Sequence, residues 1–376
     1  MHANKKIFII SNIAWTISTF RRYLIQELIE KGYEVVCVAD TDDFSDASLD
    51  IITALGARFL RVHLDRKGIN PFSDLQYFLT LFKLFRKEKP DLIIHYTMKP
   101  VIYGSIAAWL AKIPSFAILT GLGSSFIRQG ILNKIIFALL KLSLSKATKV
   151  FFLNETDKEL FLNKNLCSLQ TTYLLPGEGV DTQEYDKCDT IPSAKVRFML
   201  IARLLKDKGI YEYIEAAKII KKRFPEAEFL LAGGFDTGNP TAIKSNEVEN
   251  WANENIICYL GKTDTIKDFF VQTDVIVLPS YREGLSRLLL EAASCQKPLI
   301  TTNVPGCKEL VHENINGFLC KPKDIDSLVH AITKMVSLPP SERKKFGANS
   351  RKIVQDHFGK ERVNAIYLKM IREVIG

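Results

Sequence analysis

The segment 283-EGLSRLLLE-291 places two carboxylates in a run that is otherwise apolar enough for a protein core. Glu283 comes just before an expected helix, and Glu291 lies inside that helix. A buried carboxylate without partners is costly, so each side chain needs hydrogen-bond donors or a cation. We expect Glu283 to accept hydrogen bonds from sugar hydroxyls and Glu291 to bind a ribose 2′,3′-diol. Two structural glutamates, used as caps or ion pairs, are the alternative.

The backbone between these glutamates is suited to an anion. Gly284 lets the main chain approach a ligand closely, and Leu285 and Ser286 begin the helix expected at 285–295. The first N–H groups of a helix have no acceptor within it and are favoured by the helix dipole as sites for phosphates. We therefore expect Gly284, Leu285 and Ser286 to contact the phosphates of the same ligand.

A second basic motif, 202-ARLLKDKG-209, follows an expected strand at 196–202. Arg203 and Lys208 would stand at the carboxyl end of that strand, where parallel sheets bind ligands. A guanidinium and an ammonium group there could neutralise a diphosphate. A surface loop that is merely basic is the alternative.

Short apolar strands alternate with helices along the whole chain, which indicates parallel sheets covered on both faces. The pattern stops at the polar passage 176-PGEGVDTQEYDKCDTIPSAK-195 and then starts again. We predict an α/β fold of two Rossmann-like, doubly wound domains with ligands in a shared cleft. The predicted divisions are 1–185, 186–358 and a C-terminal helix within 359–376 that packs back on the first domain. Expected helices are 19–31, 71–88, 103–112, 130–147, 210–223, 285–295, 325–336, 340–356 and 360–375, and expected strands are 7–10, 34–39, 91–96, 115–120, 149–154, 196–202, 228–233, 256–261, 274–279 and 298–302.

Composition narrows the function classes. A chain of 376 residues with 47% hydrophobic and 25% charged residues is typical of a folded two-domain protein. None of its seven cysteines forms a C-x-x-C pair, which argues against a disulfide framework or zinc site and for a reducing compartment. We interpret Cys295, Cys307 and Cys320 as small apolar core residues. The absence of a glycine in 11-SNIAWTISTFRR-22 argues against a dinucleotide cofactor.

The net charge of +9 is unevenly distributed, since no acidic residue occurs between Asp91 and Glu155. Such a block points to an anionic partner, with a solvated basic face as the alternative. Long apolar runs between the lysines argue against nucleic acid. Neither a signal peptide nor a stretch of about 18 apolar residues is visible, so we expect a cytoplasmic protein.

Several motifs occur in one order and carry a family resemblance. They are the Arg203-x-x-x-x-Lys208-Gly motif, 232-AGG-234, 278-LPSYREGLSRLLLEA-292, 304-VPGCKELV-311 and 314-NINGFL-319. Together they resemble glycosyltransferase family 4, whose members are retaining GT-B enzymes that use nucleotide-sugars. In the first half, 90-PDLIIHYTMKPVIYGSIAA-108, 118-ILTGLG-123 and 154-NETDKELF-161 extend the resemblance.

The resemblance implies a catalytic group of Arg203, Lys208 and Glu283 on a UDP-sugar donor. It implies no metal and no other cofactor, since the two cations and the helix N-terminus would offset the leaving diphosphate. Asp324 and Asp326, the nearest approach to a D-x-D metal motif, are interpreted as a helix cap. The departing phosphate would take the proton of the acceptor, so no protein base is implied.

One feature departs from the family. Many members have a histidine at the end of the strand that here reads 115-SFAILT-120, where this chain has Thr120 and Gly121. His95, at the end of the preceding strand, could take a neighbouring role or be a core histidine. We assign His95 to the acceptor side, together with Ser11, Arg21, Arg22, Lys99, Thr120 and Gly121.

The basic block offers a surface for a lipid-linked acceptor. In 127-IRQGILNKIIFALLKLSLSKATK-149, apolar residues follow one helical face, and Lys134 and Lys141 follow another. We predict that Arg128, Lys134 and Lys141 face an anionic inner-membrane surface, on which the protein is peripheral. A core helix with a solvated lysine face is the alternative.

Within the family, the first half is most similar to bacterial enzymes that extend undecaprenyl-diphosphate-linked sugars, and among them to the N-acetylgalactosaminyltransferases of protein N-glycosylation. This likeness implies UDP-GalNAc as donor, diacetylated bacillosamine on undecaprenyl diphosphate as acceptor and an alpha linkage. Two alternatives stay open. A related transferase could use another UDP-sugar for lipopolysaccharide or capsule precursors, or the chain could be an inactive nucleotide-sugar-binding or membrane-scaffold protein.

Overall fold

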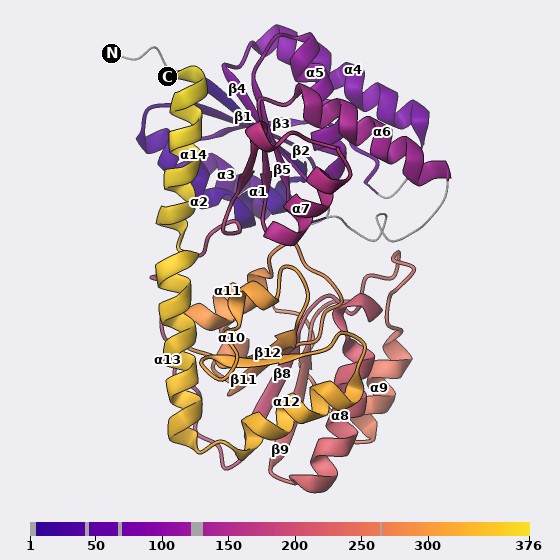
Figure 1. The fold of residues 1–376 in the computed structure, drawn as a ribbon, viewed down its shortest axis with the longest axis vertical. Helices are drawn as coiled ribbons and strands as arrows, with labels where there is room; N and C mark the ends of the chain where they lie inside the picture. Colours follow the sequence, from indigo (N-terminus) through magenta and orange to yellow (C-terminus); the bar gives the residue numbers. More distant parts are fainter. Residues whose placement is uncertain (1–4, 42–44, 67–69, 122–130, 264) are drawn as a thin grey trace. The chain divides into compact units, whose positions relative to one another are not determined.

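The computed structural model describes all residues except 1–4, 42–44, 67–69, 122–130 and 264. The chain forms two compact units, Met1–Gly179 with Lys360–Gly376, and Val180–Gly359 (Figure 1). The first division falls inside the polar passage 176–195. The last helix belongs to the first unit although it follows the second unit in sequence.

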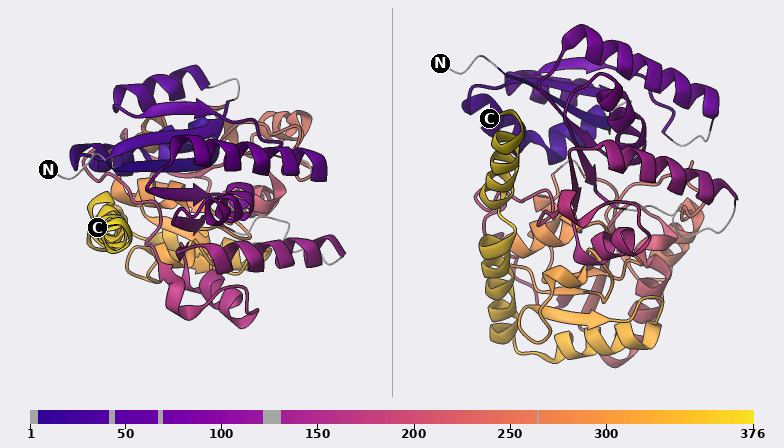
Figure 2. Two further views of the ribbon diagram at one scale, coloured as in Figure 1. Left: turned by 90° about the horizontal axis from the view of Figure 1, so that it is seen from above. Right: turned by 45° about the horizontal axis from the view of Figure 1, so that its top comes forward.

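The first unit is a seven-stranded parallel sheet in the order β3-β2-β1-β4-β5-β6-β7. Helices lie on both faces of this sheet (Figure 2). Its inner strands β1, β2, β4, β5 and β6 are largely buried because both faces are covered, as the apolar runs predicted. The elements are β1 Lys6–Ile13, α1 Ala14–Phe20, α2 Arg22–Glu30, β2 Glu34–Asp40, α3 Ser45–Ala54, β3 Arg58–Arg61, α4 Pro71–Glu88, β4 Leu92–Tyr96, a π-helical turn Pro100–Gly104, α5 Ser105–Leu110, β5 Ser115–Leu119, α6 Ile131–Lys146, β6 Lys149–Phe152, α7 Glu155–Asn163, β7 Thr172–Leu174 and α14 Lys360–Ile375.

The second unit is a six-stranded parallel sheet in the order β10-β9-β8-β11-β12-β13. Its apolar core fills both faces, with Phe198 and Phe229 stacked 5.4 Å apart on one of them. The elements are β8 Val196–Ile201, a 3-10 turn Lys206–Lys208, α8 Ile210–Arg223, β9 Ala227–Ala232, α9 Ser245–Asn253, β10 Cys258–Tyr259, α10 Lys267–Phe270, β11 Val275–Leu278, α11 Arg287–Ser294, β12 Leu299–Thr302, β13 Gly317–Cys320, α12 Ile325–Ser337 and α13 Pro340–His357.

The strand order of the second unit fixes where a ligand can enter. From β8 the chain moves to β9 and β10 on one side, and then returns to place β11, β12 and β13 on the other. The connections after β8 and β11 therefore diverge to opposite faces, which opens a crevice at the carboxyl ends of these two adjacent strands. The 202–209 and 279–286 segments both follow these strands.

The expected helix 19–31 is the clearest local error. The structure divides it at Arg21 into α1 and α2, with no side-chain cap at either start. Seven further helices and strands escaped prediction, namely α3, β3, α7, β7, α9, α10 and β13. Strand β3 is an edge strand of four residues with exposed arginines at both ends, so it lacks the apolar run that marks the buried strands.

Helix α14 packs against α2 in the first unit. Its Tyr367 hydroxyl accepts a hydrogen bond from the Tyr96 hydroxyl at 3.0 Å, and both side chains are fully or almost fully buried. Asn364 donates to the Tyr23 carbonyl oxygen at 3.2 Å, and Lys149 forms a 2.8 Å ion pair with Glu373. These contacts make α14 an integral part of that unit.

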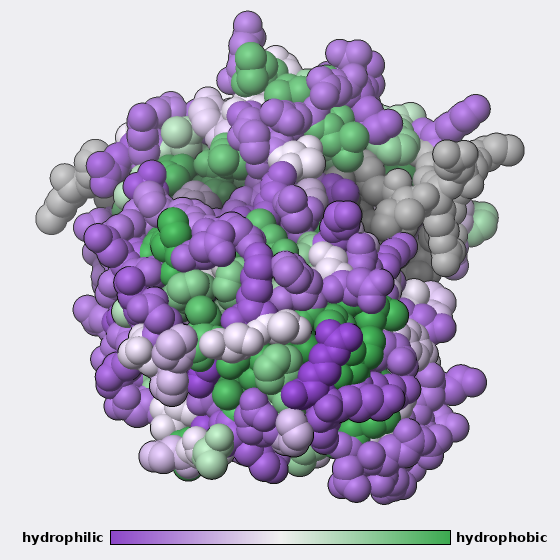
Figure 3. Space-filling model, turned by 60° about the horizontal axis from the view of Figure 1, so that its bottom comes forward, coloured by the Kyte–Doolittle hydropathy of each residue, from purple (hydrophilic) through white to green (hydrophobic). Residues whose placement is uncertain are grey.

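Figure 3 shows a face of the molecule on which hydrophilic residues predominate, with apolar patches between them. Among the helices that the structure describes, none is long and apolar enough to cross a membrane.

Gly209 ends the 202–209 segment under a strict steric constraint. It has φ +73°, and a Cβ at this position would lie 2.1 Å from the Pro279 carbonyl oxygen. We expect Gly209→Ala to lower the free energy of unfolding by about 2–3 kcal/mol, because the left-handed backbone and this clash both oppose a side chain.

Gly261 provides a matched control in the same unit. It has φ +74°, but a Cβ there would meet nothing within 4 Å. Gly261→Ala should therefore cost only about 1 kcal/mol, the backbone contribution alone. Chemical denaturation of the two variants measures the difference, and equal losses would contradict the clash with Pro279.

Candidate functional site

The central contact of the crevice joins Lys208 to Glu283. The Lys208 Nζ atom lies 2.5 Å from Glu283 Oε1, and the two side chains are 20% and 16% exposed. Lys208 comes from the connection after β8, and Glu283 comes from the connection after β11. The two residues predicted to bind the diphosphate and the donor sugar thus meet directly at the point where the strand order reverses.

Main-chain contacts hold these two connections together. The Tyr281 N–H donates to the Asp207 carbonyl oxygen at 2.9 Å, and the Ser280 hydroxyl donates to the same oxygen at 3.2 Å. On the other side, the Glu283 N–H donates to the Pro305 carbonyl oxygen at 3.1 Å. Because a Cβ on Gly306 would lie 2.7 Å from the Glu283 Cβ, the 304-VPGC-307 turn is packed directly against Glu283. This packing explains why that motif accompanies the glutamate.

Glu291 lies inside α11 and is buried. Its Oε1 atom accepts a 2.6 Å hydrogen bond from Arg287 Nε, one turn earlier on the same helix. The pKa of Tyr185 is raised, first by burial and then by the negative charge of the nearby Glu291 carboxylate. Within the protein the carboxylate is thus paired with a cation, and the ribose diol stays a prediction. The spacing of four residues between Arg287 and Glu291 could have revealed this ion pair.

Arg203 is the most accessible predicted donor-side residue. Its side chain is 64% exposed, and Nη1 lies 3.0 Å from Asp236 Oδ2, in the loop after β9. An exposed arginine in a single contact can reorient toward a ligand at little cost. Nothing in the spacing of the sequence indicated Asp236 as its partner.

The start of helix α11 differs from the prediction that three of its amides are available to a phosphate. Ser286 is the N-cap of α11, its side chain accepts from the Leu289 N–H, and its own N–H donates to the Gly306 carbonyl oxygen at 2.7 Å. The Ser286 amide therefore stabilises the 304–307 turn in this structure. Of the three amides expected at a phosphate, that of Ser286 is thus engaged within the protein.

The D-x-D motif is a cap, as predicted. Asp324 is the N-cap of α12 and accepts a 2.9 Å hydrogen bond from the Ser327 N–H. Among the described residues, no group of three or more acidic, histidine or cysteine side chains is arranged to hold a metal.

Two of the residues assigned to the acceptor side are interior in the first unit, in contrast to the prediction. Ser11 is 1% exposed and hydrogen-bonds to Thr16 at 2.7 Å. Arg21 is 3% exposed, forms a 2.8 Å ion pair with Glu178, and places its guanidinium 4.3 Å from the Tyr96 ring centroid. A guanidinium that is buried must be paired, so Arg21 fixes the break between α1 and α2 instead of offering a surface charge.

His95 is also interior. Its side chain is fully buried, and neither ring nitrogen has a hydrogen-bond partner among the residues that the structure describes. A Cβ on Gly104 would come within 2.4 Å of the ring, so the imidazole packs against the π-helical turn that follows β4. Burial lowers the pKa of His95 to about 3. This environment fits the core alternative better than a catalytic role.

The buried imidazole predicts an acid-sensitive fold. The unfolded state takes up a proton near pH 6.5, whereas folded His95 stays neutral down to about pH 3. His95 should therefore lower the free energy of unfolding by about 1.4 kcal/mol per pH unit as the pH falls below 6.5, with no effect above it. Denaturation between pH 5 and pH 8 measures this slope. His95→Asn should reduce the slope, and an unchanged slope would assign the effect to other groups.

The other acceptor-side candidates lie nearer the surface. Lys99 forms a 2.7 Å ion pair with Asp74, and Arg22 donates to the Tyr23 hydroxyl at 2.7 Å. Thr120 and Gly121 are half-buried at the carboxyl end of β5, and Gly121 has φ +146°. Lys99 is thus already neutralised by a carboxylate, which the local sequence did not indicate.

Helix α6 presents a mixed surface. Lys134 and Lys141 are exposed, but Ile135 and Leu142 are exposed beside them, at 53% and 44%, while Leu140 and Leu144 form the buried side. The lysines and the apolar residues Ile135 and Leu142, which the prediction assigned to two faces of this helix, are therefore all exposed, and a role at a membrane stays a prediction. Arg128 lies outside the residues that the structure describes.

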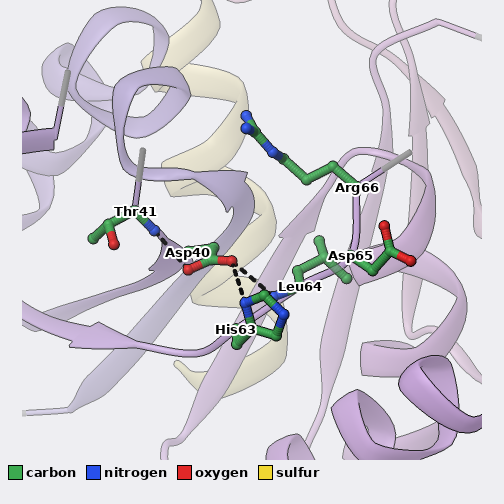
Figure 4. A pocket seen from close by; sticks show the side chains of 6 residues that line it. All are labelled: Asp40, Thr41, His63, Leu64, Asp65 and Arg66. Atoms are coloured by element: carbon green, nitrogen blue, oxygen red, sulfur yellow. Dashed lines mark hydrogen bonds and ion pairs between the residues drawn. The ribbon is translucent and has the colours of Figure 1, made fainter. Parts of the chain in front are cut away.

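A cavity of about 340 Å³ lies at the carboxyl end of β2. Its centre is Asp40, which is 6% exposed, accepts from the Leu64 N–H at 3.0 Å and lies 2.9 Å from His63 Nδ1. Arg66 extends over the Asp40 side of the cavity, whereas Asp65 points away from it (Figure 4). Although burial raises the pKa of Asp40, hydrogen bonds from the Leu64 and Thr41 N–H groups lower it on balance. This polar cavity was not predicted from the sequence.

Comparison with known proteins gives two family matches that together span most of the chain. Residues 6–154 match the family "Glycosyl transferase 4-like", and residues 181–353 match "Glycosyl transferases group 1". Among relatives, the N,N'-diacetylbacillosaminyl-diphospho-undecaprenol alpha-1,3-N-acetylgalactosaminyltransferase of Campylobacter jejuni is 28% identical over 98% of this chain and 99% of its own length. An alpha-1,3-galactosyltransferase of Escherichia coli, named for UDP-Gal and GlcNAc-diphosphoundecaprenol, is 28% identical over 72% of each chain.

Solved structures agree in fold. HepE of Anabaena, crystallised with UDP and glucose, superposes with a TM-score of 0.78 at 17% identity, covering 98% of this chain and 100% of its own. The sucrose-phosphate synthase of Thermosynechococcus elongatus gives a TM-score of 0.78 at 18% identity, with 98% of each chain covered. The family matches, the relatives and the two doubly wound sheets agree, and the chain belongs to the family 4 glycosyltransferases of the GT-B fold.

Proposed function

We propose that the protein is a retaining glycosyltransferase that moves a sugar from a UDP-linked donor onto a saccharide carried by undecaprenyl diphosphate. The observation that supports it most is the Lys208–Glu283 contact of 2.5 Å at the reversal of strand order. When a donor enters, its diphosphate would attract Lys208 away from Glu283, and the freed carboxylate would accept hydrogen bonds from sugar hydroxyls. Arg203 would turn from Asp236 to the same phosphates.

These residues would act on the transition state by charge. As the bond to the diphosphate breaks, negative charge grows on the leaving group, and Lys208 and Arg203 are placed to offset it in a partly dry crevice. The departing phosphate oxygen would take the proton of the acceptor hydroxyl. We propose that no metal is required. Transfer that stops in EDTA and returns with Mg²⁺ would contradict this part.

The finer proposal is N-acetylgalactosamine, alpha-linked from UDP-GalNAc onto diacetylated bacillosamine. It rests on the Campylobacter relative, which matches this chain over almost its full length. The alternative is another UDP-sugar on a lipopolysaccharide or capsule precursor, which is supported by the Escherichia coli relative and by the CapM capsular enzyme of Staphylococcus aureus, 27% identical over 83% of this chain.

One experiment separates these possibilities. The purified protein is given a panel of UDP-sugars with lipid diphosphates that carry bacillosamine or GlcNAc, and the products are identified by mass and NMR. Exclusive use of UDP-GalNAc with the bacillosamine acceptor is the expected result. Preference for UDP-Gal with the GlcNAc acceptor would establish the alternative, and failure of every donor to react or hydrolyse would favour an inactive binding protein.

The acceptor side is proposed to meet an anionic membrane through the helices α4, α5 and α6 of the first unit. Together with Lys134 and Lys141, they expose a set of large apolar side chains, which suits the interface of a bilayer that carries negative charge. These are Phe72, Leu75, Leu79, Trp109, Leu110, Ile135 and Leu142, each between 43% and 83% exposed.

Liposome binding tests this surface. Lys134→Glu with Lys141→Glu should reduce binding to anionic vesicles at least about tenfold, since each lysine near such a surface contributes about 1 kcal/mol and the replacement is repelled. Lys222→Glu with Arg223→Glu on α8 changes the net charge equally and should have little effect. Equal losses in the two double variants would mean that net charge, not this surface, governs binding.

A further inference from the structure

Cys188 and Cys295 lie together in the second unit, although they are 107 positions apart in the sequence. Their sulfur atoms are 2.9 Å apart, and both residues are free cysteines. Cys188 is partly exposed in the segment that leads from Tyr185 toward β8, and it lies between exposed Lys187 and Asp189. Cys295 is fully buried at the carboxyl end of α11. One thiol can thus be reached from solvent, and the other lies directly behind it.

The surroundings hold the two sulfur atoms in this position. Lys297, only 2% exposed, donates from Nζ to the Cys188 carbonyl oxygen at 3.0 Å and to the Thr190 hydroxyl at 2.7 Å. The Ser294 hydroxyl, next to Cys295, donates to the Tyr185 carbonyl oxygen at 2.5 Å. These bonds fasten the 185–190 segment to the end of α11 on both sides of the cysteine pair, so the contact does not depend on one flexible side chain.

The same surroundings give the two thiols different reactivity. The hydrogen bond with Cys295, and further the charge of Lys297, lower the pKa of Cys188. The contact with Cys188 and burial raise the pKa of Cys295. Because the thiolate is the attacking species, Cys188 should react first and Cys295 should follow.

We propose that Cys188 and Cys295 form a redox modification site, at which a low-molecular-weight disulfide converts the two thiols into an intramolecular disulfide. In the first step the Cys188 thiolate attacks the small disulfide, forms a mixed disulfide and releases one thiolate. In the second step the Cys295 sulfur gives up its proton, attacks Cys188 and releases the second thiolate, which takes that proton. Two protein thiols are oxidised and one small disulfide is reduced to two thiols.

The bond would fasten α11, which carries Glu291, to the segment that carries Tyr185. It would also close a long loop, and a crosslink of this kind restricts the unfolded chain. Oxidation should therefore raise the melting temperature of the protein by several degrees. The modification is independent of which sugar the enzyme transfers.

The test titrates the full-length protein with glutathione disulfide and reduced glutathione in varying ratio, followed by alkylation, peptide mass mapping and melting curves. Wild type should lose two hydrogens and yield a peptide that joins positions 188 and 295. Cys295→Ser should accumulate stable glutathione on Cys188, and Cys188→Ser should leave Cys295 unmodified. Cys258→Ser, which removes an exposed cysteine elsewhere in the unit, should behave as wild type.

Two results would overturn the proposal. One is wild-type protein that keeps glutathione on Cys188 beside a free Cys295, which would mean that the pair cannot close. The other is Cys188 reacting no faster than the exposed Cys258 in the wild-type protein. Donor binding, measured separately with UDP, reports on the proposed transferase site, so failure of one proposal is distinguishable from failure of the other.

Discussion

Replacing Lys208 by Met should reduce kcat/KM for sugar transfer about 10²- to 10³-fold. The loss is of this size because a fixed cation aimed at a leaving diphosphate interacts more strongly with the transition state than with the ground state. The Lys208 side chain is 20% exposed and is held by the connection after β8. Little water can therefore enter the Lys208→Met variant to offset the charge of the diphosphate in place of the lysine. Steady-state kinetics with the UDP-sugar donor measures the effect.

Lys206→Met is the matched control, since Lys206 stands in the same turn and is exposed. It should change kcat/KM by no more than about twofold. The double variant Lys208→Met with Glu283→Gln tests a different cause, because it removes the carboxylate that the single variant leaves unpaired. It should recover stability but not activity. A Lys208→Met protein as active as the Lys206→Met protein would remove Lys208 from the mechanism.

The second large effect distinguishes the proposed role of Glu283 from that of Glu291. Glu291→Gln should weaken binding of UDP and of the UDP-sugar alike, by about 10- to 100-fold, which is the size expected for charged hydrogen bonds to ribose hydroxyls. Glu283→Gln should weaken only the UDP-sugar, and it should leave UDP binding equal or slightly tighter because Lys208 loses its internal partner. Calorimetric titration with both ligands gives the four dissociation constants.

The controls follow from the contacts of each carboxylate. Glu291 is paired with Arg287 at 2.6 Å, so its replacement must be checked for loss of stability by melting. An Arg287→Met variant removes the cation and keeps the carboxylate, and a smaller loss of UDP affinity is expected from it. If Glu283→Gln and Glu291→Gln weakened UDP equally, the assignment of sugar to one and ribose to the other would be wrong.

Local signals in the sequence predicted most of the fold. Helices α4 and α8 were predicted with both ends, and Pro71 stands at the start of the one and Gly209 directly before the other. The alternation of buried strands and helices led to two doubly wound sheets. What failed were elements with weak local signals, such as β3, and the break at Arg21, which depends on an ion pair with Glu178 that is 157 positions away.

The candidate site, like the fold, could be predicted where the signal is local and not where it depends on residues far apart in the sequence. Residue types and motif order identified Arg203, Lys208, Glu283 and Glu291 as candidates, and the structure brings Lys208 and Glu283 together across 75 positions. The partners of Arg203 and Glu283 could not be predicted, since Asp236 and the Gly306 turn reach the site only through strand order. Cys188 and Cys295 lie far apart in the sequence, so their spacing gave no sign of the contact between them.

The position of α14 has a consequence for synthesis of the protein. Residues 360–376 leave the ribosome only after the whole second unit, yet they belong to the same unit as residues 1–179. While the second unit is being made, the hydroxyl of Tyr96 and the outer side of α2 still lack the partners that Tyr367 and Asn364 provide. Domains usually fold in the order in which they are translated, whereas here the one begun first is completed last. A stop codon introduced just before position 360 would therefore damage the first unit, although all seven strands of its sheet would still be made.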